Sequence, residues 1–124
     1  MSLWGKLFGK SNKQSGNDVA DLPMYWQWIS SNNPIEQFTG IGSIEMVFRE
    51  HPDAIGGPEH NRSVELLRRV LNGRSKALQK EAMTVLALIK AKDALPDISK
   101  KLDDADPNVR EKARIASDML RGIA

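Results

Sequence analysis

The most informative part of this chain is Leu102-Asp103-Asp104-Ala105-Asp106-Pro107-Asn108-Val109-Arg110. It holds the end of one amphipathic helix, a short acidic turn and the start of a second helix. Asp106 can cap a helix N-terminus, and Pro107 suits the first helical position because its missing N–H would have no partner there. The sequence therefore predicts two helices joined by a tight turn.

The same helical pair occurs twice, at a spacing of 31 residues. Apolar residues then match as Val64 with Leu95, Leu67 with Ile98, Leu71 with Leu102, Leu78 with Val109, Ala82 with Ala113, Val85 with Ala116 and Ile89 with Leu120. Repetition at such a period is typical of helical-repeat proteins. Residues 22–57 do not follow this register, because Glu36, Gly40, His51 and Pro58 would interrupt the apolar stripe. We expect an irregular helical cap there.

About seven helices are expected in all. The first carries Leu22, Tyr25, Trp26 and Ile29 on one face, and Asn33-Pro34 opens the second, which we expect to break near Gly42. A third then runs from Ser43 to Phe48. The fourth begins at Pro58 or Ser63 and ends near Asn72, and Ser75 caps the fifth. The apolar residues Leu95, Ile98 and Leu102 mark the sixth helix, and Asp106 caps the seventh. The fold class is therefore all-α.

Residues 93–122 resemble a HEAT repeat, and residues 62–92 resemble a degenerate second copy. The resemblance is carried by Leu102, Asp104, Asp106, Pro107, Val109, Arg110 and Ala113, which fall where that family places them. It implies a short α-solenoid whose second helices line a surface for a protein partner. It also implies that Arg110 ties repeats together through an acidic residue such as Asp104 or Asp106. The resemblance therefore implies a non-catalytic protein that acts as an adaptor, assembly factor or regulatory subunit.

Composition divides the chain into an N-terminal arm, residues 1–21, and a single helical domain, residues 22–124. The 124 residues carry a net charge of +2 and no cysteine. The longest nearly apolar run, Met83 to Ile89, is far shorter than the roughly 20 residues that cross a bilayer. Residues 1–10 lack a secretory signal, so we expect a cytoplasmic protein.

One face of the last helix carries Arg110, Arg114, Ser117 and Arg121, and the matching residues of the fifth helix are Gln79, Met83, Leu86 and Lys90. Arg and Met recur at protein-binding sites because they offer large, adaptable contact area. We expect the protein partner to bind Met83, Leu86, Lys90, Arg110, Arg114 and Arg121. The alternative is a solvated face in which Arg110 has a structural role.

The N-terminal arm places Leu3, Trp4, Leu7 and Phe8 on one helical face, with Lys6 and Lys10 around it. This layout is typical of an interfacial membrane anchor, but the arm is short and contains Gly5 and Gly9. The alternatives are docking on its own domain, on a partner, or no stable structure. A charge-driven peripheral membrane or nucleic-acid binder is therefore the alternative function.

Several other features are weaker. Residues 62–124 have fourteen basic and nine acidic residues, net +5, but no aromatic residue follows Phe48, which argues against nucleic-acid binding. His51 and His60 are expected at the surface, and no motif indicates a metal, a cofactor or an enzyme. Met24 and Trp28 project away from the core face of the first helix, and we expect one of them to cover the end of the array; the alternative is an exposed anchor for a partner. Exposed Ile115 and Met119 would favour a homodimer.

Overall fold

The computed structural model describes residues 17–123, and every regular element in that range is helical. The α-helices are α1 (Leu22–Ile29), α2 (Pro34–Glu50), α3 (Pro58–Leu71), α4 (Lys76–Leu88), α5 (Leu95–Lys100) and α6 (Pro107–Arg121). Short 3-10 helices are η1 (Val19–Asp21), η2 (Pro52–Ala54), η3 (Lys92–Ala94) and η4 (Lys101–Asp103). The prediction of an all-α fold is confirmed for this part of the chain.

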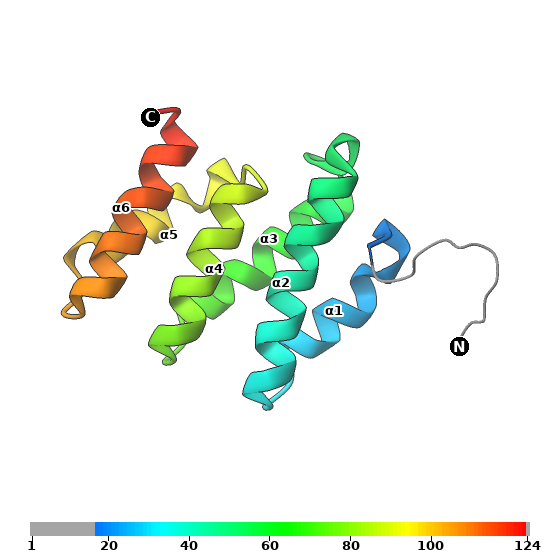
Figure 1. Ribbon diagram of the computed structural model, residues 1–124, viewed down its shortest axis with the longest axis horizontal. Coiled ribbons are helices and arrows are strands. Elements are labelled where there is room, and N and C mark those ends of the chain that lie inside the picture. Colours follow the sequence, from blue (N-terminus) through cyan, green and yellow to red (C-terminus); the bar gives the residue numbers. More distant parts are fainter. Residues whose placement is uncertain (1–16, 124) are drawn as a thin grey trace.

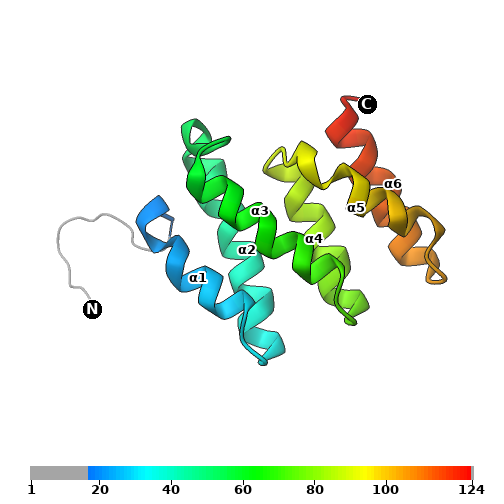
Figure 2. The same ribbon diagram turned by 180° about the vertical axis from the view of Figure 1, so that it is seen from behind.

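The helices form two rows. In one row α2 packs on α4 and α4 packs on α6, which Figure 1 shows side by side. In the other row α1 contacts α3 and α3 contacts α5, as seen from behind in Figure 2. Because α1 also packs on α2, α3 on α4 and α5 on α6, three helical pairs follow one another along the chain.

Each helix of the α2–α4–α6 row begins with a side-chain cap. The Asn33 side chain accepts from the backbone N–H groups of Ile35 and Glu36, Ser75 accepts from Leu78, and Asp106 accepts from Asn108. These bonds satisfy N–H groups that have no partner inside the helix. The three caps also give a common origin for comparing positions along the three helices.

The first pair repeats the pattern of the other two at a longer spacing. A shift of 42 residues places Leu22, Tyr25 and Ile29 on Val64, Leu67 and Leu71, and all six are buried. The same shift places Asn33 on Ser75. The 11 residues beyond the 31-residue spacing fall between residues 47 and 64, in the end of α2, the loop with η2 and the start of α3. The segment expected to be an irregular cap is therefore a third helical pair.

The predicted break near Gly42 is wrong, because α2 continues from Pro34 to Glu50. Gly40 is buried, and a Cβ atom on it would lie 2.9 Å from the Tyr25 carbonyl oxygen. Gly40 therefore lets α2 approach α1 closely, as Ala82 and Ala113 do at the matching positions of α4 and α6. Packing of this face holds the helix together despite its two glycines. The described residues accordingly form six α-helices, not seven.

The aromatic residues of α1 attach the first pair to the core. Tyr25 is buried, and its ring centroid lies 5.3 Å from that of Trp28, which packs half-buried against the core. Burial raises the pKa of the Tyr25 hydroxyl, with a further contribution from the charge of Asp21. Trp26 donates from Nε1 to the Ser63 hydroxyl at 2.9 Å, which links α1 to α3. Met24 is exposed, so it does not cover the end of the array.

Candidate protein-binding surface

The predicted partner surface on α4 lies inside the molecule. Met83 and Leu86 are both 0% exposed. Their counterparts in α2, at the same distance from the cap, are Ile41 and Ile44, which are also fully buried. This face of α2 and α4 packs against other helices. The assignment of Met83 and Leu86 to partner binding is therefore wrong, because a partner would reach them only by opening the core.

On α6 the same face carries charge in place of apolar side chains. Arg110, Arg114 and Arg121 are exposed there. Arg114 pairs with Glu111 at 2.6 Å and with Asp118 at 3.3 Å, and the hydrogen bond and charge of the arginine hold the pKa of the Glu111 carboxyl below its usual value. We call this exposed, charged face of α6 the end face.

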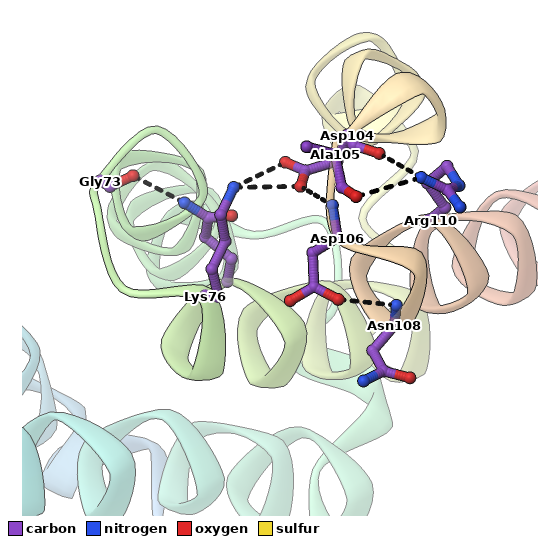
Figure 3. A network of polar contacts seen from close by, with 8 residues as sticks. Gly73, Lys76, Asp104, Ala105, Asp106, Asn108 and Arg110 are labelled. Atoms are coloured by element: carbon purple, nitrogen blue, oxygen red, sulfur yellow. Dashed lines mark hydrogen bonds and ion pairs between the residues drawn. The ribbon is translucent and has the colours of Figure 1, made fainter.

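Arg110 and its neighbours hold the turn that precedes α6 (Figure 3). The Arg110 guanidinium donates from Nη1 to the backbone oxygens of Asp104, at 2.8 Å, and Ala105, at 3.3 Å. Arg110 therefore binds the backbone of the turn within its own helical pair, α5–α6. The tie between pairs is made by Lys76, whose Nζ lies 2.8 and 3.1 Å from the Asp104 carboxylate oxygens.

The Asp104 carboxylate also accepts from the backbone N–H of Asp106 at 2.9 Å. This bond and, above all, the one from Lys76 hold the pKa of Asp104 below its usual value. In the α3–α4 pair, Gln79 takes the place of Arg110. It donates from Nε2 to the backbone oxygen of Gly73, at 2.7 Å, as Arg110 does to that of Asp104. The acidic turn that revealed the repeat therefore stabilises the fold.

His60 is buried, contrary to the expected surface position. Its Nε2 lies 2.8 Å from the carbonyl oxygen of Ile89, and its ring meets that of Phe48 edge-on at 5.2 Å. Because a carbonyl oxygen only accepts, Nε2 donates in this bond. His60 thus joins the start of α3 to the end of α4. His51 is partly exposed at the end of α2.

The outward face of the α2–α4–α6 row carries the exposed apolar side chains. Thirteen residues after their caps, the three helices have Met46, Leu88 and Met119 at equivalent positions. Leu88 is 45% exposed and Met119 47% exposed, and Met46 is partly exposed. Ile115 lies one turn before Met119 and is also exposed. We call Met46, Leu88, Ile115 and Met119 the apolar stripe.

Further exposed apolar residues lie on the same row. The large exposed hydrophobic residues of the described chain are Met24, Ile35, Phe38, Leu88, Ile115, Met119 and Ile123, and five of these seven belong to α2, α4 or α6. Sequence periodicity pointed to Ile115 and Met119 but missed Met46 and Leu88. The 31-residue spacing already pairs Leu88 with Met119, so this equivalence was the available signal.

Three cations lie beside one end of the apolar stripe. Lys90, Lys92 and Arg121 line a hollow of about 270 Å³ together with Met119 and Leu120. Within residues 17–123, none of the three cations lies in an ion pair, and no acidic side chain lines this hollow. Lys90 and Arg121 were predicted to contact the partner, and both are exposed.

The outward face of the other row is charged and paired. On α3, Arg62 and Arg69 each bind Glu65, at 2.9 and 2.8 Å, and Arg68 binds Asp97 of α5. Arg62 and Arg69 hold the pKa of the Glu65 carboxyl below its usual value, chiefly through the hydrogen bond from Arg62. The arginines of this face therefore already have partners within the fold.

The arm residues Leu3, Trp4, Leu7 and Phe8 lie outside the described residues. Within residues 17–123, none of the helices has the length and hydropathy needed to cross a bilayer. The same range holds no group of three or more His, Asp or Glu side chains placed to bind a metal ion.

Comparison with protein-family models, with curated proteins and with solved structures found no match to this chain. The function is therefore inferred from the residues of the chain itself.

Proposed function

We propose that this protein is a non-catalytic, HEAT-like helical-repeat module that binds a protein partner on the outward face of α2, α4 and α6. The solenoid assignment is supported by three helical pairs stacked in two rows and by buried positions that recur at spacings of 42 and 31 residues. Its role is that of an adaptor, assembly factor or regulatory subunit.

The observation that carries this proposal is the apolar stripe. Apolar side chains at one level of three adjacent helices form a row that crosses the helix axes. Burying a Leu or Met side chain fully is worth about 1.5–3 kcal/mol, so even half of that for each of four residues is a substantial gain on binding. Methionine is also frequent at binding surfaces because its flexible, polarisable side chain adapts to different shapes. We infer a partner that presents an apolar ridge across the three helices.

The charge-driven alternative receives less support. Arg62, Arg68, Arg69 and Arg114 already bind carboxylates within the fold, which lowers the positive charge available to phosphate groups. Non-specific nucleic-acid binding depends on free cations that neutralise phosphates. After Phe48 the sequence contains no Phe, Tyr or Trp that could stack on nucleic-acid bases.

The proposal is tested by capture with the full chain. Wild type, the double variant Leu88→Glu with Met119→Glu, and the control Met24→Glu are immobilised and exposed to extract of the source cells at physiological salt. Met24 matches Met119 closely, being a methionine of 42% exposure, but it lies on α1 in the other row. All three proteins should unfold at similar temperatures because the altered side chains are exposed.

We expect one or more proteins to bind wild type and Met24→Glu but not the double variant. Their direct affinity is then measured with purified components. A partner that the double variant retains would refute the apolar stripe as the binding surface. Sedimentation of the purified chain tests whether a second copy of this chain occupies the apolar stripe. A dimer that dissociates only in the double variant would make the stripe a self-association surface.

A further inference from the structure

Lys90 has a backbone conformation that usually belongs to glycine. Its φ is 60°, and it is the only residue other than glycine with positive φ in the described chain. It ends α4 in a turn where the N–H of Lys90 donates to Ala87 and the N–H of Ala91 donates to Leu86. A side chain in this left-handed region is disfavoured by contact between its Cβ and the backbone.

The end of α6 makes the same turn with a glycine. Gly122, φ 76°, donates to Met119, and Ile123 donates to Asp118, which repeats the two bonds at the end of α4. The chain therefore uses glycine at one of two equivalent turns and a strained lysine at the other. The turn itself does not require a side chain at residue 90, so the lysine indicates a use for its ammonium group.

The surroundings of Lys90 indicate what that use is. Its side chain shares the hollow of about 270 Å³ with Lys92 and Arg121, and Met119 of the apolar stripe lines the same hollow. Cations also suit helix C-termini, where the backbone dipole is negative. That effect accounts for Arg121 at the end of α6 but does not require a strained lysine at residue 90. Three cations that form no ion pair within residues 17–123, beside a row of apolar side chains, complement a partner that carries an anionic group next to an apolar one.

We propose that Lys90, Lys92 and Arg121 bind carboxylates of the protein that occupies the apolar stripe. The partner segment has apolar residues followed by an acidic cluster, and the acidic cluster sets the direction in which the segment lies across the helices. This inference rests on the proposed function, since it assigns the chemistry of the same partner. Charge complementarity of this kind selects orientation and accelerates association.

The first test is zero-length cross-linking of the full chain to the protein that wild type captures and that the Leu88→Glu, Met119→Glu variant loses. A carbodiimide joins an ammonium to a carboxylate only where the two are in direct contact. We expect cross-links from Lys90 or Lys92 to Asp or Glu residues of that partner. Lys100, exposed on α5 in the other row, serves as the internal control and should give none.

The second test uses charge and turn variants in the same capture. The triple variant Lys90→Glu, Lys92→Glu and Arg121→Glu should bind that partner about tenfold more weakly at low salt, and the loss should shrink at high salt. Lys90→Gly should weaken binding about threefold while raising the melting temperature by about 4 °C, because glycine relieves the strained turn. Lys100→Gly, which has no such strain to relieve, should leave binding unchanged.

The outcomes separate this inference from the proposed function. A partner that depends on the apolar stripe but binds the triple variant normally would overturn the inference and leave the proposed function standing. The absence of any stripe-dependent partner would overturn both. A 20-nucleotide single-stranded DNA that binds wild type more tightly than the captured protein, and not the triple variant, would overturn the carboxylate assignment in favour of phosphate.

Discussion

The two glycines of α2 provide a matched pair of substitutions. Gly40 and Gly42 lie two residues apart in one helix, yet their surroundings are opposite. A Cβ atom on Gly42 would have no neighbour within 4 Å, whereas one on Gly40 would lie 2.9 Å from the Tyr25 carbonyl oxygen and 3.1 Å from atoms of Trp28 and Ile29. The pair therefore separates the helix-forming tendency of alanine from the cost of close packing.

Alanine inside a helix is favoured over glycine by about 1 kcal/mol. For Gly42→Ala we expect this whole gain, and a rise in melting temperature of about 4 °C. For Gly40→Ala the same gain is opposed by overpacking against the backbone of α1, which costs about 1–3 kcal/mol because α1 and α2 must move apart. The expected net effect is a loss of about 1 kcal/mol, so the two variants should differ by about 2 kcal/mol.

The assay is urea unfolding of the full chain, followed by circular dichroism at 222 nm. The slope of the transition should be the same in both variants, since neither changes the surface exposed on unfolding. Equal stability of the two variants would refute the reasoning, because it would show that α2 lies near α1 without needing a residue that lacks a Cβ. The continuity of α2 would then need another explanation.

Three further predictions concern the two faces of α4, the turn before α6 and the end face of α6. Met83→Glu should lower the free energy of unfolding by about 3 kcal/mol or more because it buries a charge, whereas Leu88→Glu should change it by less than about 0.5 kcal/mol; urea unfolding distinguishes them. The pKa of Asp104 is lowered by folding, so its contribution to stability is present above its unfolded pKa and is lost as pH falls through the folded pKa. Thermal unfolding should therefore show wild type losing more stability between pH 5 and 2 than Lys76→Met, and identical pH profiles would exclude this ion pair as the cause. Arg114→Glu should leave the melting temperature nearly unchanged and the captured partner bound, since Arg114 lies on the end face; loss of the partner would extend the binding surface to that face.

The helical pattern was predictable because it depends on local interactions. The Asp106 cap, Pro107 at the first helical position and the 31-residue recurrence from Val64 to Leu120 all rest on spacing along the chain. The α1–α2 pair was missed because it matches the α3–α4 pair at a spacing of 42 residues and not 31. Eleven residues added between α2 and α3 shift the register, and a fixed-period comparison then places Glu36 and Gly40 on apolar positions.

The location of the candidate surface was not predictable in the same way. Periodicity shows that Met83, Leu86 and Lys90 share a helical face, but it does not show which neighbouring helix covers that face. In the structure Met83 and Leu86 are buried and Lys90 is exposed, whereas Arg114, at the position of α6 that matches Met83, is exposed.

Most helix positions, their caps, the 31-residue recurrence and the composition of each face were predictable from the sequence, because they follow from residue types and their spacing along the chain. The continuity of α2, the pairing of α1 with α2, the burial of His60 and the place of the apolar stripe on the outward face of one row became visible only in the folded structure. The physical reason is that exposure depends on which helices pack together, and that packing joins residues such as Tyr25 and Gly40, or His60 and Ile89, that are far apart in the chain.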